Sequence, residues 1–167
     1  MKNIFLLLLL SFNTLYAISL FPPQAGDLKT EGDVSFLNSR LVLRQTNASV
    51  KAKAELCNIS NRSGRNYRLS YEVRGTGGSS DATGFQFYRL QLLWTAAGRE
   101  VKRIANDWQD TTNEYIQKKW FDFTAPLEAA ELQLVFQLRG QGGIEISNLS
   151  LTERPEVPKS PFRIEFT

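Results

Sequence analysis

The chain of 167 residues contains no histidine and a single cysteine. Without histidine it has no Ser-His-Asp or Cys-His nucleophilic site, no imidazole acid or base, and no histidine metal ligand. The lone Cys57 cannot form an internal disulfide, so packing alone must hold the fold together. A pair of carboxylates, as used in glycoside hydrolysis, is the one enzymatic route that these absences leave open.

Carboxylates are numerous, but their spacing singles out no catalytic pair. They are distributed as acids on turns and on the outer faces of strands usually are. The candidates are Glu72, Asp81, Asp107, Asp110, Glu114, Asp122 and Glu145. We therefore predict that the chain is not an enzyme and has no catalytic residues. A small carboxylate-dependent glycosidase or lyase is the alternative, which release of a sugar product would reveal.

The chain also lacks a concentration of charge of one sign. Its 20 basic and 17 acidic residues give a net charge of +3, to which Lys2 contributes at the extreme N-terminus. The basic residues are scattered among acids, whereas binding to phosphates requires a concentrated basic face. Nucleic acid is therefore not a predicted partner.

Long apolar runs are absent except at the N-terminus. Residues 1–17 combine a basic start, the apolar block Ile4–Leu10 and the small residue Ala17, which predicts a secretory signal peptide cleaved after Ala17. The apolar block is short for a bilayer span, and an uncleaved anchor is the alternative. We therefore expect a secreted, periplasmic or bacterial cell-surface protein with no membrane contact after cleavage.

The remaining residues, about 150, suit a single domain with a sizeable core. Residues 18–34 contain prolines and glycines and predict a lead-in segment with one edge strand. Residues 35–154 form the predicted domain. Pro155 and Pro158 mark residues 155–167 as a linker or terminal strand.

Alternation of apolar and polar residues predicts strands throughout the domain. In Tyr67–Arg74, apolar side chains occupy one face and polar side chains the other. In Phe85–Trp94, Tyr88, Leu90, Leu92 and Trp94 share a face, which places Trp94 in the core. The run Ala48–Leu56 favours a strand over a helix for the same reason. Regularly spaced strands with turns between them and no helical period predict an all-β antiparallel β-sandwich.

Two alternating runs flank a glycine cluster near the C-terminus. The first is Leu132–Arg139 and the second is Ile144–Leu151, with Gly140, Gly142 and Gly143 between them. Two half-buried strands joined through glycines predict an antiparallel hairpin.

Several motifs resemble one superfamily. A Gly64-x-x-Tyr67 turn enters a strand that ends in Arg74-Gly75, and the aromatic strand from Trp120 leads to Ala125-Pro126. The last strand is Ile144-Glu145-Ile146-Ser147-Asn148-Leu149. Over about Ser35–Thr152 the chain is similar to the galactose-binding-like jelly roll of many carbohydrate-binding modules in bacterial polysaccharide-degrading enzymes. The resemblance implies a jelly-roll fold and a non-catalytic binding role.

The resemblance also bears on cofactors. A last-strand position that is often Asp in this superfamily, where it helps to hold a structural calcium, is Ser147 here. A serine hydroxyl replaces a carboxylate poorly as a calcium ligand. We therefore predict no cofactor and no metal ligands, with the case for calcium weakened by Ser147.

Sugar binding requires a flat aromatic ring that stacks on a pyranose. Trp108 lies in a polar stretch and is the first candidate, with Tyr115 second. The alternative is that either ring plugs the end of the sandwich. Trp120 lies on the face opposite Phe121 and Phe123, where it is either exposed or packed under a loop.

Sugar binding also requires planar polar groups that bond to hydroxyls. Such side chains face away from the core on three predicted strands, and the preferred binding residues are Arg89, Gln91, Gln137 and Arg139. Further outward residues are Arg68, Glu72, Arg74, Phe87 and Gln133. The sequence leaves open which of these strands share a sheet, and an ordinary solvated sheet is the alternative.

Together these features predict a secreted, non-catalytic carbohydrate-binding module that targets an enzyme or surface assembly to a polysaccharide or oligosaccharide. A catalytic domain or enzyme is the expected protein partner. The alternative is a bacterial surface protein-interaction or structural β-sandwich that binds no sugar.

Overall fold

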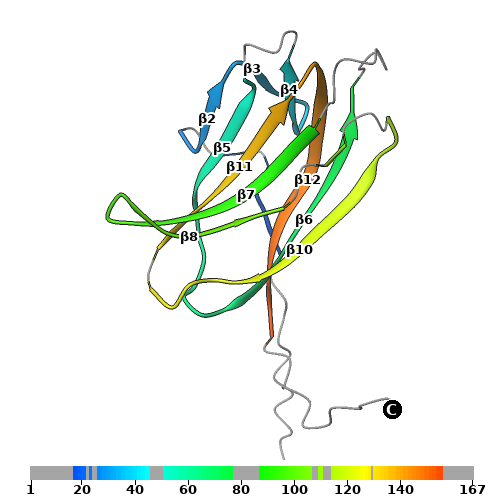
Figure 1. Ribbon diagram of the computed structural model, residues 1–167. Coiled ribbons are helices and arrows are strands. Elements are labelled where there is room, and N and C mark those ends of the chain that lie inside the picture. The colour runs from blue at the N-terminus through cyan, green and yellow to red at the C-terminus, as the bar shows by residue number, and fades with distance from the viewer. Residues whose placement is uncertain are drawn as a thin grey trace, which may run out of the picture.

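The computed structural model describes residues 17–21, 23, 26–45, 51–76, 87–106, 109–110, 114–128 and 130–155. These residues form two antiparallel sheets that face one another (Figure 1). Within the described ranges, no helix has the length and apolar character needed to cross a bilayer. Residues 1–16 of the predicted leader, Trp108, and the predicted linker beyond residue 155 lie outside the described residues.

The first sheet, called sheet A, is built around the last strand of the fold. Its order is β10 (Gln117–Thr124), β6 (Asn66–Gly75), β12 (Gly142–Arg154), β4 (Arg40–Gln45) and β3 (Asp33–Leu37). The short strand β1 (Ala17–Ser19) pairs with the C-terminal half of β12. β6 and β12 therefore lie at the centre of sheet A.

The second sheet, called sheet B, is built around β11. Its order is β2 (Leu28–Glu31), β5 (Lys53–Ile59), β11 (Glu131–Arg139), β7 (Phe87–Ala96) and β8 (Arg99–Ala105). The two-residue strand β9 (Gln109–Asp110) pairs with the start of β7. The predicted all-β antiparallel sandwich is confirmed.

The core lies between the sheets and follows the alternation of the sequence. On β7 the predicted face is buried, and Trp94 is fully buried as expected. Aromatic contacts join the layers: Tyr71 of sheet A meets Phe136 of sheet B with ring centroids 5.8 Å apart. Trp94 of sheet B meets Phe123 of sheet A at 5.4 Å. Both contacts have the edge-to-face geometry that aromatic pairs favour.

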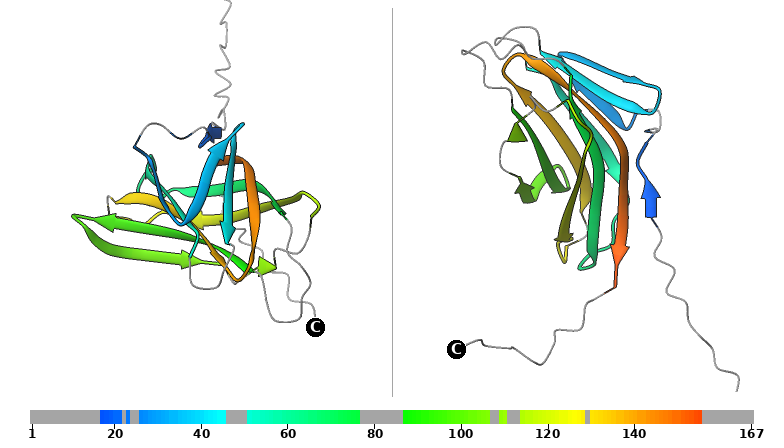
Figure 2. Two further views of the ribbon diagram at one scale, coloured as in Figure 1. Left: turned by 90° about the horizontal axis from the view of Figure 1, so that it is seen from above. Right: turned by 90° about the vertical axis from the view of Figure 1, so that its right-hand side faces the viewer.

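The lead-in segment contributes two strands rather than the one expected, and they join different sheets. β1 pairs with β12, which the right-hand view of Figure 2 shows as the blue strand beside the orange one. β2 pairs with β5 at the edge of sheet B. Between them Phe21 is 9% exposed and packs against Phe36 at 5.1 Å. This part of the chain therefore belongs to the sandwich.

The predicted C-terminal hairpin is wrong. β11 pairs with β5 and β7 in sheet B, whereas β12 pairs with β1, β4 and β6 in sheet A. The chain crosses between the layers through Gly140 and Gly142, whose φ angles of 90° and 125° suit glycine. Alternation requires only that each strand have one buried face. Two strands that face each other across a core meet that requirement as well as two strands that pair side by side.

Replacement of a core aromatic should strongly destabilise a fold that has no disulfide. Phe136 is fully buried, so Phe136→Ala is expected to lower the free energy of unfolding by about 3–5 kcal/mol through lost burial and a residual cavity. Urea denaturation measures this change. Leu127→Ala, at a side chain that is 87% exposed, is the control and should change stability by less than about 0.5 kcal/mol. A similar small loss for Phe136→Ala would contradict the assigned core.

Candidate functional site

The outer face of sheet B carries a planar polar cluster formed by Arg89, Gln91 and Gln137, here called the Arg89 cluster. Arg89 and Gln137 lie directly opposite each other on β7 and β11, and Arg89 Nη2 donates to Gln137 Oε1 at 2.8 Å. With the Gln91 amide oxygen assigned toward Arg89, that oxygen accepts from Nε at 3.1 Å and Nη2 at 2.8 Å. The two amides therefore fix the orientation of the guanidinium.

The members of the Arg89 cluster differ in exposure. Arg89 and Gln137 are half-buried, whereas Gln91 is only 8% exposed. Gln91 thus supports Arg89 from beneath rather than presenting its own amide to solvent. Val135 of β11 lies directly opposite Gln91, between Gln133 and Gln137 along the strand, and is 3% exposed, so it adds an apolar side chain to this face.

Phe87 and Arg139 form the next pair along the same two strands. Arg139 is exposed and lies opposite Phe87, which is half-buried on the outer face of β7. The structure therefore brings together the four polar residues predicted from sequence, Arg89, Gln91, Gln137 and Arg139. It adds an aromatic ring beside them, that of Phe87.

The two aromatic candidates are placed differently. Tyr115 is 82% exposed on the segment that leads into β10 of sheet A. Trp108 lies outside the described residues, although Gln109, which follows it, pairs with Tyr88 next to Arg89. A role for either ring in binding stays a prediction.

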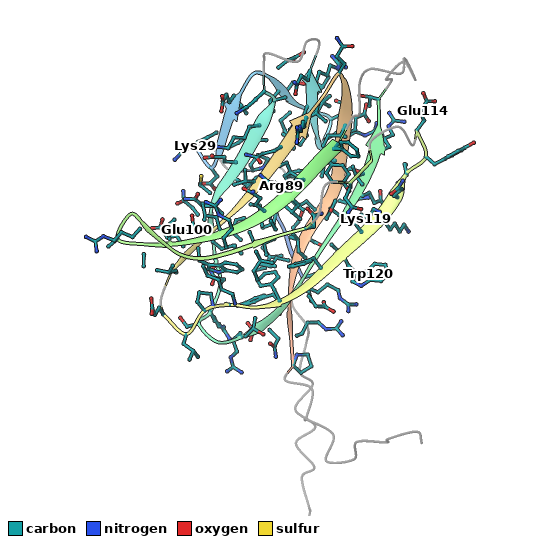
Figure 3. The ribbon with its side chains drawn as sticks, viewed as in Figure 1. Lys29, Arg89, Glu100, Glu114, Lys119 and Trp120 are labelled. Carbon is teal, nitrogen blue, oxygen red and sulfur yellow. The ribbon has the colours of Figure 1, made fainter. Side chains whose placement is uncertain are left out.

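The outer face of sheet A carries an exposed tryptophan. Trp120 of β10 is 66% exposed and lies opposite Ser70 of β6, so the exposed alternative for this residue is confirmed. Ser70 in turn lies opposite Ser150, and Ser150 opposite Ser19. One row of the sheet therefore consists of three serines and Trp120, which we call the Trp120 row. Figure 3 labels Trp120 on β10 and Arg89 on β7, strands of opposite sheets.

A polar depression of about 190 Å³ adjoins the Trp120 row. Its polar lining comes from β6, β12 and the β3–β4 turn and consists of Asn38, Ser39, Arg40, Glu72, Arg74, Glu145, Ser147 and Asn148. Val73 and the exposed Ile116, which precedes β10, add apolar surface to it. Within this lining, Glu145 Oε2 accepts from Arg40 Nη1 at 3.1 Å and from Arg74 Nε at 2.9 Å. Glu72 Oε2 accepts from Asn148 Nδ2 at 2.8 Å.

An irregularity in β12 shapes this depression. The pairing of β12 with β6 shifts register between Ser147 and Ser150, and Asn148 has a φ of 51°. A bulge of this kind redirects a side chain from the regular alternation. Here it aims the Asn148 amide at Glu72. The sequence signal was the break in alternation between Ile146 and Leu149.

Among the residues that the structure describes, the acids outside these contacts form no metal-binding cluster. Glu72 and Glu145 both line the depression, but each already has a partner. Asn148 donates to Glu72, and Arg40 and Arg74 form ion pairs with Glu145. Asp81 and Asp107 lie outside the described residues. Within the described ranges, no group of three or more His, Cys, Asp or Glu side chains is placed to hold a metal ion. Cys57 is 6% exposed, and burial raises the pKa of its thiol.

A bidentate ion pair borders the Trp120 row on its other side. Arg68 donates through Nε and Nη2 to the two carboxylate oxygens of Asp122, both at 2.7 Å. These hydrogen bonds lower the pKa of Asp122 and raise that of Arg68. Asp122 is therefore ionised at neutral pH and tied to the sheet beside Trp120.

Comparison with known proteins identifies the fold class. No protein-family model and no curated protein matches the chain. Several solved structures match with TM-scores above 0.5. One is the enzymatically active domain of bacteriophage CBA120 tailspike protein 4, at TM-score 0.57 and 16% identity, over 84% of this chain and 19% of that one.

Two further matches contain carbohydrate-binding modules. The CBM22-1–GH10 modules of Clostridium thermocellum Xyn10B, complexed with xylohexaose, match at TM-score 0.52 and 14% identity, over 89% of this chain and 27% of that one. The CBM22-1 xylan-binding domain of Paenibacillus barcinonensis Xyn10C matches at TM-score 0.56 and 11% identity, over 85% and 95% of the two chains.

These matches confirm the resemblance to carbohydrate-binding modules at the level of the fold, a jelly-roll β-sandwich. The chain spans less than a third of the length of the tailspike and Xyn10B chains.

The Arg68–Asp122 pair predicts an acid titration shift. In an NMR-monitored titration the Asp122 carboxyl should titrate below the ordinary value of about 3.9, and Arg68→Gln should move it back toward that value. Because the folded pKa is depressed, the stabilising contribution is present above the unfolded pKa and is lost as the pH falls through the folded pKa. Arg74→Gln, which removes a partner of Glu145 instead, is the control. An unshifted Asp122 in wild type would contradict the pair.

Proposed function

We propose that this chain is a secreted, non-catalytic carbohydrate-binding module, and that it binds a polysaccharide on the outer face of sheet B. The observation that carries the proposal is the Arg89 cluster, in which two glutamine amides hold a guanidinium at the surface of the sheet. A planar donor group that is already fixed loses little conformational freedom when it binds a ligand.

The chemistry of the cluster suits sugar hydroxyls. A guanidinium is a multiple donor, and a glutamine amide both donates and accepts, so together they match the mixed demands of vicinal hydroxyls. The half-buried ring of Phe87 and the exposed guanidinium of Arg139 extend the same face along β7 and β11. Such a face combines apolar and hydrogen-bonding surface, as a pyranose does.

The similar structures support this ligand class and a modular role. The matched Paenibacillus barcinonensis domain binds xylan, and the matched Clostridium thermocellum chain joins its module to a GH10 module. By analogy, this chain would hold an enzyme or a surface assembly close to a polysaccharide. The predicted leader at residues 1–17 and the predicted linker at 155–167 support export and attachment to such a partner.

A glycan screen tests the proposal. Titration calorimetry against xylohexaose and a panel of plant, algal and host glycans should reveal at least one ligand. Arg89→Ala should weaken binding by about 1.5–3 kcal/mol, because hydrogen bonds from a charged donor are lost. The control is Arg99→Ala, which removes the same charge from an exposed position on β8 of the same sheet.

The screen also separates the alternative function. Absence of binding to every glycan, together with stable self-association in sedimentation analysis, would favour a structural or protein-interaction sandwich. Release of reducing or unsaturated sugars from the panel would instead favour a carboxylate-dependent enzyme.

Trp108, the first aromatic candidate from the sequence, provides a second test of the proposal. If its ring stacks on a sugar bound to sheet B, Trp108→Ala should weaken binding by about 1–3 kcal/mol, roughly the energy of burying a large ring. Trp108→Phe should retain part of the affinity because it keeps an aromatic face. Calorimetry with the best ligand from the screen measures both variants. Equal affinities for wild type and Trp108→Ala would show that the stacking residue lies elsewhere.

A further inference from the structure

The outer face of sheet A has the components of a ligand site that is separate from the Arg89 cluster. Outward-facing side chains of the two sheets point to opposite sides of the sandwich, because each strand directs its other face into the shared core. A ligand on the Trp120 row therefore cannot contact Arg89. The two surfaces can be tested independently of each other.

Trp120 is exposed because its neighbours are small. The residue directly opposite is Ser70, and the row continues with Ser150 and Ser19, none of which has a side chain tall enough to cover an indole. The indole ring is 66% exposed, and the rest of the row presents only short serine side chains. A flat ligand ring can approach such an indole without displacing a protein side chain.

The surroundings of Trp120 favour a sugar over an apolar protein partner. Its neighbours on the same face of β10 are Lys118 and Asp122, and Asp122 is held by Arg68. The core of a protein–protein interface is depleted of charge and enriched in clustered apolar groups. The immediate neighbours of Trp120 are instead a serine and charged side chains, and one apolar ring among polar groups complements the apolar and polar faces of a saccharide.

The depression begins one step along β6 from the row. Glu72 is the next outward-facing residue after Ser70, about 7 Å further along the strand, and it lines the depression. The hydrogen bonds of Glu72 and Glu145 use Oε2 of each carboxylate. Within the described part of the chain, Oε1 of both carboxylates has no hydrogen-bond partner. Two acceptors are thus available to hydroxyl donors.

We propose that the Trp120 row and the adjoining depression form a second saccharide-binding surface, in which Trp120 stacks on one sugar ring and Glu72 and Glu145 accept hydrogen bonds from the hydroxyls of the next. With the Arg89 cluster on the opposite sheet, one molecule then holds two glycan chains, one on each side. Two-sided binding would let the protein cross-link a polysaccharide, and the avidity would exceed the affinity of either surface.

The test uses single and combined variants of the full chain with xylohexaose and cellohexaose as probes. In calorimetry, wild type should bind two oligosaccharides per molecule, and Trp120→Ala should bind one. In the Arg89→Ala background the remaining binding should weaken roughly tenfold or more when Trp120→Ala is added, because a stacked ring is lost. Glu72→Gln, which keeps the shape of the side chain, should weaken this same surface.

A spectroscopic readout assigns the site. In a Trp108→Phe, Arg89→Ala protein, Trp94 is fully buried and Trp120 is exposed, so iodide should quench Trp120 selectively. Oligosaccharide should protect Trp120 from iodide. The control Leu127→Ala removes an 87% exposed apolar side chain outside both surfaces and should change neither stoichiometry nor protection.

The outcomes separate this inference from the proposed function. Loss of all binding in Arg89→Ala, with Trp120→Ala unchanged, would overturn the second surface and support the first. Loss of all binding in Trp120→Ala alone would overturn the assignment to sheet B and support the second surface. Absence of binding of either probe by wild type, or self-association abolished by Trp120→Ala, would overturn the second surface.

Discussion

The fold depends on one contact, the packing of two apolar sheet faces against each other without a disulfide between them. Cys57 has no partner cysteine, so the hydrophobic and aromatic contacts across the interlayer carry the stability. The edge-to-face pairs of Trp94 with Phe123 and of Tyr71 with Phe136 each join one sheet to the other. Loss of this packing would separate the layers, because the backbone hydrogen bonds hold strands within sheets only.

The same constraint generates both candidate surfaces. Each strand uses every second side chain for the core, which leaves the other half to form an outer face. Register then decides which outward residues become neighbours. It places Arg89 opposite Gln137 on sheet B and Trp120 opposite Ser70 on sheet A. A shift of one residue in either pairing would turn these side chains into the core, so the packing that stabilises the sandwich also positions the sites.

The sequence predicts burial better than it predicts pairing. Alternation correctly assigns Trp94 to the core and Arg89 and Gln137 to an outer face, because a period of two is a local property of one strand. It does not specify the partner strand, which is why β11 and β12 were expected to form a hairpin but lie in different sheets. The exposure of Trp120 was left open for the same reason. Its neighbour Ser70 lies 50 positions earlier, and only the fold brings the two together.

The bulge in β12 is a position that alternation could not assign, and it coincides with the polar depression on sheet A. A continuous period of two through β12 would send Asn148 into the core, where an unpaired amide is costly. The bulge instead leaves Ile146 and Leu149 buried and turns Asn148 outward to bind Glu72. Asn148 accepts a φ of 51°, which asparagine tolerates better than most residues. The bulge preserves the core and at the same time builds one wall of the depression. A bulge that served packing alone would not require a side chain able to bond to an outward carboxylate.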